Sequence, residues 1–188
     1  MTHRFADITF TDSVKSAQEN YGSRARNERM RAIAGPNDQL GVRETEFIEQ
    51  RDTFYLATIS ETGWPYVQHR GGPAGFLKVL SADRLGFADF RGNTQLVSVG
   101  NASVNDRCSL ILMDYPNRRR LKILAHMRVE DVDKVDQQSL AAVDLPDYKA
   151  RVERVVFIDI VAFDWNCPQH ITRRYTESEF AKLKEEMR

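Results

Sequence analysis

The stretch TFYLATISETGWPYVQHRGG, residues 53–72, decides the fold. Its two arms are short runs of β-branched and aromatic residues, and the ETGW turn between them is short and contains glycine, which is typical of paired strands. Further runs of the same kind follow along the chain: FLKVL at 76–80, LGFADF at 85–90, RCSLILMDY at 107–115, RRLKILAHMRVEDV at 119–132 and RVVFIDIVAFDW at 154–165. The pattern predicts an antiparallel meander.

The spacing of these runs limits how the strands can be connected. Most connections are too short for the helical crossovers of a doubly wound parallel sheet. Short turns, together with helices at both ends and one between strands, favour a small closed or split barrel. We therefore expect a mainly β fold, a six- to seven-stranded antiparallel barrel with N- and C-terminal helices.

Helical patterns flank the strands. Residues 12–32 form a weakly amphipathic pattern that breaks or kinks at Gly22, and the turn-rich AGPNDQLG, 34–41, separates it from a short helix in ETEFIEQR. Near the end, Thr176 and Glu179 have the spacing of a capping box. This organisation predicts an N-terminal helical arm and linker over 1–42 and a barrel domain with a C-terminal helix over 43–188.

Composition narrows the partners. Lys plus Arg and Asp plus Glu both number 27, so net charge gives no reason to expect nucleic acid or an anionic membrane. The start MTHRFADITF lacks the apolar core of a signal peptide, and no window approaches the roughly 20 apolar residues of a membrane span. We expect a cytoplasmic protein. Cys108 and Cys167 form neither a disulfide framework nor a zinc ligand set, and no metal site is expected.

Four segments concentrate polar side chains. In PYVQHRG, alternation places Tyr66, Gln68 and Arg70 on one face, beside a glycine-rich continuation that lets a ligand approach the backbone. A solvated edge strand would look similar. In RGNTQ, 91–95, Asn93 or Thr94 could cap a helix whose N-terminus favours phosphate, although ordinary capping explains them equally well.

The other two segments are more basic. In RRRLK, 118–122, alternation points Arg118, Arg120 and Lys122 to the same side, where they could meet an anion; a solvated hairpin and a nucleic-acid patch are the alternatives. The loop NCPQHITRRY, 166–175, gathers Gln169, His170, Arg173 and Arg174, and a surface histidine without a role is the alternative there.

Known side-chain catalytic motifs are missing. The sequence has no GxSxG, HExxH, P-loop or GxGxxG, and its four histidines lack metal spacing. No catalytic residue can be assigned from the sequence. This absence points towards a cofactor that carries the chemistry itself, as a flavin would.

The segments PYVQHRGGP, LGFADFRGNTQ, DYPNRRRLKI and CPQHITRRY resemble the pyridoxamine 5′-phosphate oxidase-related FMN-binding proteins, over roughly residues 45–175. The resemblance implies a split β-barrel homodimer with FMN at the subunit interface and a small-molecule substrate. By position it implies cofactor contacts from strand residues Gln68, His69, Arg70, Gly71, Ala88 and Asp89, from the phosphate-end residues Asn93 and Gln95, from Arg120 and Lys122 on the far side of the flavin, and from Gln169, His170 and Arg174 in the closing loop.

The sequence also departs from that family. Pro73 stands where the true oxidases have a substrate-binding lysine, and Tyr148 and Arg151 match their substrate-phosphate set poorly. These departures argue against vitamin B6 oxidation. The predicted function is an FMN-dependent oxidoreductase acting on an unknown small molecule or a reduced pyridine nucleotide; the alternative is a non-catalytic flavin- or haem-binding barrel.

Overall fold

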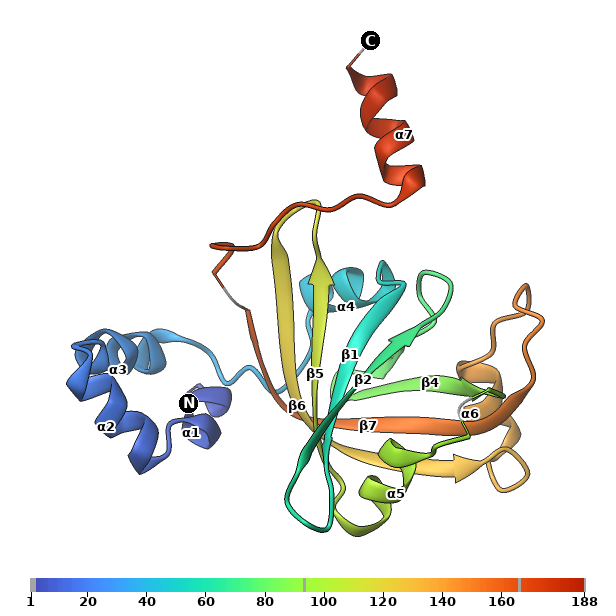
Figure 1. The fold of residues 1–188 in the computed structure, drawn as a ribbon, viewed down its shortest axis with the longest axis horizontal. Helices are drawn as coiled ribbons and strands as arrows, with labels where there is room; N and C mark the ends of the chain where they lie inside the picture. Colours follow the sequence, from blue (N-terminus) through green and yellow to red (C-terminus); the bar gives the residue numbers. More distant parts are fainter. Residues whose placement is uncertain (1–2, 93, 166, 188) are drawn as a thin grey trace.

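A computed structural model describes residues 3–92, 94–165 and 167–187. Its body is a seven-stranded antiparallel sheet in the order β2-β1-β5-β6-β7-β4-β3 (Figure 1). The strands are β1 (Thr53–Ile59), β2 (Pro65–Gly71), β3 (Lys78–Ser81), β4 (Arg84–Phe90), β5 (Arg107–Asp114), β6 (Arg119–Asp131) and β7 (Val152–Trp165). The expected mainly β, antiparallel fold with helices at both ends is confirmed.

The sheet curls without closing. In the part of the chain that the structure describes, the edge strands β2 and β3 do not pair with each other. The curl nevertheless brings distant strands together across the inside, where Phe54 of β1 meets Phe87 of β4 edge-on, with ring centroids 5.5 Å apart. The barrel is therefore split, and the split lies beside β2 and β4.

The core follows the alternation expected for half-buried strands. On β6, Leu121 and Ile123 are fully buried, whereas Arg120 and Lys122 lie on the outer face. Cys108 on β5 is also buried, as the sequence predicted, and burial raises the pKa of its thiol to about 12. One face of the sheet thus belongs to the core and the other remains partly exposed.

Two helices pack directly against the barrel. Helix α4 (Val42–Glu49) buries Phe47 and Ile48, and Trp165 at the end of β7 donates to Glu44 at 2.7 Å. Helix α5 (Val97–Val104) is held to β1 by a buried hydrogen bond of 2.9 Å from Asn101 Nδ2 to Thr58 Oγ1. These contacts fix both helices on the sheet.

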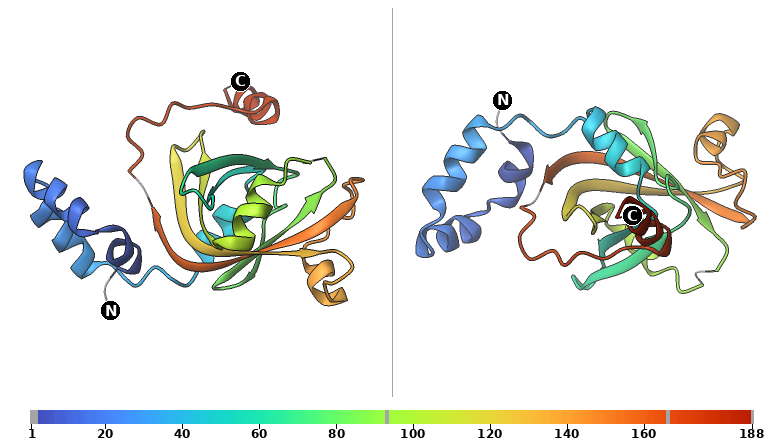
Figure 2. Two further views of the ribbon diagram at one scale, coloured as in Figure 1. Left: turned by 60° about the horizontal axis from the view of Figure 1, so that its bottom comes forward. Right: turned by 90° about the horizontal axis from the view of Figure 1, so that it is seen from above.

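The N-terminal arm consists of α1 (Arg4–Thr9), α2 (Asp12–Asn20) and α3 (Arg24–Ile33), which lie together at one side of the barrel (Figures 1 and 2). The predicted break is confirmed at Gly22, which has φ 70°. Helix α1 was not predicted from the sequence. It has only six residues, and the side chain of His3 caps it by accepting from the Ala6 amide at 3.2 Å.

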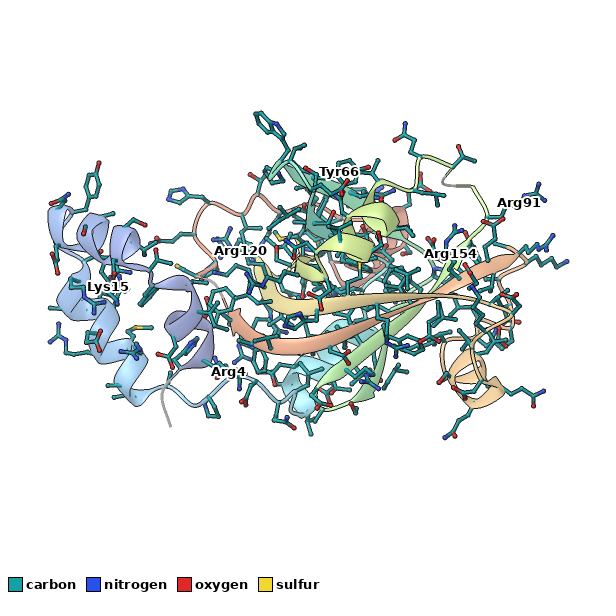
Figure 3. All side chains as sticks on the ribbon, turned by 90° about the horizontal axis from the view of Figure 1, so that it is seen from below. Arg4, Lys15, Tyr66, Arg91, Arg120 and Arg154 are labelled. Carbon is teal, nitrogen blue, oxygen red and sulfur yellow. The ribbon has the colours of Figure 1, made fainter. Side chains whose placement is uncertain are left out.

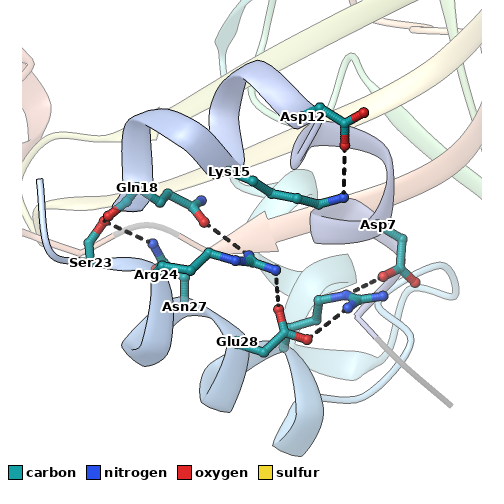
Figure 4. Close-up of polar contacts among 9 residues, drawn as sticks. Asp7, Asp12, Lys15, Gln18, Ser23, Arg24, Asn27 and Glu28 are labelled. Atoms are coloured by element: carbon teal, nitrogen blue, oxygen red, sulfur yellow. Dashed lines mark hydrogen bonds and ion pairs between the residues drawn. The ribbon is translucent and has the colours of Figure 1, made fainter. Parts of the chain in front are cut away.

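Ion pairs join the arm helices to one another (Figure 4). Arg31 of α3 reaches Asp7 of α1 at 2.5 Å and Glu28 at 2.9 Å, and Glu28 also pairs with Arg24 at 2.7 Å. Partly exposed pairs of this kind contribute little stability. Their main effect is to orient α1 against α3.

The last two helices are peripheral. Helix α6 (Gln137–Ala142) is capped by Asp136, whose carboxylate accepts from the Ser139 amide. Helix α7 (Glu177–Glu186) begins at the predicted capping box and lies apart from the barrel on an extended segment (Figure 1). None of the helices in the described residues is long and apolar enough to cross a membrane.

Candidate functional site

A cavity of about 260 Å³ opens at the split, between β2 and β4. We call it the split cavity. It brings together two segments that the sequence singled out separately, and it is lined by Gln68, His69, Arg70, Gly71, Phe76, Phe87, Ala88, Asp89, Phe90 and Tyr148. The candidate residues on β2 and β4 therefore line one cavity.

One face of β2 points into the barrel and supplies the polar lining of the cavity. Tyr66, Gln68 and Arg70 share one face, as the alternation predicted, and Arg70 is only 8% exposed. Gln68 is held from behind by α5, because Ser98 donates to its Oε1 at 3.0 Å. The strand is thus neither an ordinary apolar core strand nor a fully solvated edge.

Charge is concentrated at the centre of this cavity. Arg70 Nη1 lies 2.7 Å from Asp89 Oδ1, and Arg154 Nε of β7 lies 2.9 Å from Asp89 Oδ2. Asp89 is only 4% exposed, so its charge needs these partners. Two guanidinium groups share this carboxylate, and Arg154 also pairs with Glu153 at 3.2 Å, which leaves Asp89 as the only counter-ion of Arg70 among the described residues.

Part of that charge has no acceptor. Arg70 Nε and Nη2 are buried and have no hydrogen-bond partner among the described residues. An unsatisfied buried donor costs about 1–3 kcal/mol, and more when it is charged. A guanidinium held in place by Asp89 with two donors left over is arranged to receive an acceptor from a ligand.

Aromatic side chains form the apolar wall. The guanidinium carbon of Arg70 lies 5.8 Å from the ring centroid of Phe87, which belongs to the core cluster with Phe54 and Phe76. Phe90 and Tyr148 meet edge-on at 4.9 Å. Apolar walls with a few fixed polar groups are typical of small-molecule sites.

His69 and Gly71 lie on the other face of β2 and border the cavity. His69 Nε2 is 2.5 Å from Thr53 Oγ1, and the ring lies edge-on to Tyr55 at 5.7 Å. A Cβ at Gly71 would lie 3.1 Å from the His69 ring and 3.4 Å from the Asp52 carbonyl oxygen. Glycine at 71 therefore leaves room for the imidazole.

The two basic residues of β6, Arg120 and Lys122, lie away from the split cavity. Lys122 Nζ lies 3.1 Å from Asp164 and 4.7 Å from the Phe5 ring centroid, beside the arm. Arg120, whose Nε is buried without a partner among the described residues, lies on the opposite side of the barrel from Arg154 (Figure 3). A single chain does not bring Arg120 or Lys122 to the split cavity.

The C-terminal loop is also separate from it. Gln169 and His170 are exposed, and His170 has φ 62°. The Arg174 guanidinium lies 5.1 Å from the Tyr115 ring centroid. Burial, followed by a side-chain hydrogen bond with Tyr55, raises the pKa of Tyr115. This loop contacts the end of β5, outside the split cavity.

The segment that was expected to hold a phosphate, residues 91–95, does not form the predicted helix start. Helix α5 begins at Val97, and its N-cap is Leu96 at φ 54° with no side-chain capping bond, so the prediction of Thr94 as the cap is wrong. The left-handed turn at Leu96 delays the helix start. Asn93 lies outside the described residues. Gln95 is exposed and is not part of the split cavity lining.

Two further polar residues belong here that the sequence patterns did not place at this site: Tyr148 in the cavity lining and Arg154 behind Asp89. Arg154 stands directly opposite Asp89 in the β4–β7 register, and Tyr148 lies in the connection that precedes β7. The arginine that begins the mainly apolar RVVFIDIVAF was the available signal for Arg154. Among the described residues, no group of three His, Cys, Asp or Glu side chains is placed to hold a metal ion.

The family model of pyridoxamine 5′-phosphate oxidase matches residues 43–161, and the chain belongs to that family. No curated protein matches it. A candidate pyridoxamine 5′-phosphate oxidase of Lactobacillus delbrueckii has a similar solved structure, with TM-score 0.53 and 19% identity over 69% of this chain and 96% of the other.

Two further solved structures have the same fold. HupZ of Group A Streptococcus has TM-score 0.54 and 10% identity over 72% of this chain and 100% of its own. An FMN-binding protein of Syntrophomonas wolfei has TM-score 0.51 and 11% identity over 76% and 95%. At these identities the likeness establishes a common fold.

Proposed function

We propose that this protein is an FMN-binding flavoprotein, and that it is an oxidoreductase acting on a small molecule or a reduced pyridine nucleotide. One observation carries the proposal: the buried guanidinium of Arg70 has two unpartnered donors at the split cavity. The family assignment and the FMN-binding neighbour from Syntrophomonas wolfei support the same cofactor.

The residues at the split cavity fit a flavin chemically. A flavin combines a flat apolar ring system that has hydrogen-bonding edges with an anionic phosphate. Phe87 and Tyr148 offer apolar contact, Gln68 offers an amide, and Arg70, held by Asp89, offers a positive group with unpartnered donors. When bound, FMN would supply the electron transfer, and the chain's own residues would bind and orient it.

A second copy of the chain would complete the site. The split cavity, at about 260 Å³, is below the roughly 300–1,000 Å³ of complete small-molecule sites. The outer face of the sheet carries partly exposed apolar side chains on neighbouring strands. Tyr55 of β1 pairs with Ile111 of β5, and Leu124 lies on the next strand, β6. We propose that this outer face packs on a second copy, which brings Arg120 and Lys122 to the partner's flavin.

The remaining cofactor assignments follow from that arrangement. Gln169, His170 and Arg174 would close the site from the C-terminal loop, and Gln95 would lie near the phosphate end. The cytoplasmic location expected from the sequence belongs to the same proposal. No catalytic residue is assigned.

The test combines flavin retention with two arginine variants. Arg70→Ala should weaken FMN binding by about tenfold or more, because each hydrogen bond to a charged group contributes about 1.5–3 kcal/mol. Asp89 keeps Arg154 as its partner in this variant. Arg84→Ala is the matched control, because Arg84 lies on β4 in an exposed pair with Asp159. Equal FMN affinity in the two variants would reject the site.

Turnover separates the oxidoreductase from a non-catalytic carrier. The FMN-loaded protein is mixed with NADH or NADPH and an electron acceptor, and flavin absorbance is followed. Cycles of bleaching and recovery are expected. A flavin that stays bound but cannot be cycled would favour the non-catalytic alternative.

A further inference from the structure

A second cavity lies where the N-terminal arm meets the barrel. Its volume is about 570 Å³, within the roughly 300–1,000 Å³ range of small-molecule sites. We call it the arm cavity. Its lining combines arm residues, chiefly Phe5, Phe10, Val14, Met30 and Ala34, with Lys122, Asp164 and Trp165 from the barrel. Most of this lining lies outside the residues that match the family, so the cavity is a feature of this chain's arm.

The walls of the arm cavity are apolar and incompletely covered. Met30 remains 57% exposed and Val14 36% exposed, although both face the cavity. Covering such side chains stabilises a complex by about 25 cal/mol per Å² of apolar area. An apolar molecule seated between α1, α2, α3 and Trp165 would gain this contribution.

The charged groups at the arm cavity are already paired. Lys122 lies 3.1 Å from Asp164, which His3 also approaches at 3.6 Å. Arg31 is engaged by Asp7 and Glu28. An anionic ligand would have to break one of these pairs. The arm cavity therefore differs from the split cavity, where a buried arginine keeps unpartnered donors.

The polar groups of the arm cavity gather at one end. Asp164 lies near both Lys122 and His3, so this end offers donors and an acceptor, and the charges of the lysine and the carboxylate balance. The other walls are aromatic and aliphatic. This arrangement fits a molecule with an apolar ring body and one hydrogen-bonding group.

In the proposed dimer, Lys122 would lie between this cavity and the partner's flavin. It lies on the outer face of β6, opposite Ile111 in register and on the same face as Arg120. We propose that the arm cavity is the substrate pocket, and that it takes an uncharged aromatic small molecule whose polar group faces Lys122, Asp164 and His3. The role of the bound molecule as a substrate rests on the proposed function, whereas the existence of a binding site rests on the arm cavity alone.

The test uses N-phenyl-1-naphthylamine, an uncharged aromatic probe whose fluorescence rises in apolar surroundings. Ala34→Phe places a ring inside the arm cavity, and the neighbouring Ile33→Phe, at a position 86% exposed, adds the same group in solvent. We expect Ala34→Phe to weaken probe binding by about tenfold or more and Ile33→Phe to leave it unchanged. Equal probe affinity in the two variants would overturn the proposal.

Two further measurements guard against misfolding. Val14→Phe fills the arm cavity from α2 and should have the same effect as Ala34→Phe. In the unmodified chain, the probe should slow thiol labelling of the exposed Cys167, which also lines the arm cavity. Labelling at an unchanged rate under saturating probe would count against the site.

FMN titrations separate this inference from the proposed function. Ala34→Phe should keep the FMN affinity of the unmodified protein, and FMN should not displace the probe. Competition between the two, together with loss of FMN in Ala34→Phe, would make the arm cavity the flavin site and overturn the inference. Probe binding without any FMN binding would remove the proposed function and leave the arm cavity as a ligand site.

Discussion

Asp89 determines how positive charge is held at the split cavity. Its two carboxylate oxygens each accept from a different arginine, Arg70 and Arg154. Because all three groups are buried or nearly so, the carboxylate fixes the guanidinium that is offered to a ligand. A change at Asp89 should therefore affect folding stability as well as binding.

Asp89→Asn should lower the free energy of unfolding by about 3–5 kcal/mol, because it leaves the buried Arg70 guanidinium without its counter-ion, whereas Arg154 keeps Glu153. Urea denaturation followed by tryptophan fluorescence measures the change. Asp159→Asn, in an exposed pair on β7, serves as the control and should cost no more than about 1 kcal/mol. A similar small effect at both positions would show that the buried cluster does not need its carboxylate.

The two cysteines should differ in reactivity. Burial raises the pKa of Cys108 to about 12, so its thiol stays protonated at neutral pH, whereas Cys167 is exposed. Ellman's reagent should label one thiol per native chain at neutral pH, and the second only after unfolding. Cys167→Ser should abolish the native signal. Rapid labelling of native Cys167→Ser would contradict the buried position of Cys108.

The sequence predicted the alternation of β2 but not the meaning of its polar face. Tyr66, Gln68 and Arg70 could equally have faced solvent. Their inward position depends on the curl of the sheet, which brings Arg70 to Asp89 on β4, the carboxylate that also pairs with Arg154 on β7. Contacts between residues so distant in sequence have no local signature.

Helix α5 links the split cavity to the barrel. Ser98 holds Gln68, and Asn101 satisfies Thr58, which is only 1% exposed. Both contacts lie on the buried side of the helix. Loss of the Asn101 hydrogen bond should therefore weaken the packing of α5 on both β1 and β2.

Asn101→Ala should destabilise the protein by about 1–3 kcal/mol, because it leaves the buried Thr58 hydroxyl without its donor. The midpoint of urea unfolding measures this change. Thr58→Val combined with Asn101→Ala should cost less than the sum of the two single changes, since the pair is removed together. Additive costs would show that the two side chains do not interact. The exposed Ser103→Ala, on the same helix, should stay within about 0.5 kcal/mol of the unmodified protein.

Helix starts were predicted correctly where the sequence has a specific capping pattern, and incorrectly or not at all where it has none. The capping box of Thr176 and Glu179 correctly located the start of α7. The start of α5 was misplaced because it uses Leu96 at positive φ, which no capping preference anticipates. Helix α1 was missed because its six residues depend on packing against β7 rather than on their own pattern.

At the scale of the molecule, the proposed dimer would use the partly exposed outer face of β1, β5 and β6. Leu124→Glu places a charge on that face and should convert the dimer to a monomer with weakened FMN binding. Analytical ultracentrifugation gives the mass. Val104→Glu, at an exposed position on α5, adds the same charge elsewhere and should remain dimeric. A monomer in the unmodified protein would contradict the proposed interface.

Turns and alternation are local, so they were sufficient to predict the barrel, and the resemblance of four segments predicted its family. It could not predict that the arm would enclose a cavity on β6 and β7. That cavity depends on contacts between Lys122, Phe5 and Asp164, which come from three distant segments. The arm is therefore the part of the molecule about which the structure shows most that the sequence did not predict.

The most direct test of the account is a titration of the unmodified protein with FMN, followed by quenching of flavin fluorescence. The account predicts saturation at one FMN per chain, with clearly weaker binding in Arg70→Ala and unchanged binding in Arg84→Ala. Absence of saturable FMN binding to the folded, unmodified protein would contradict it.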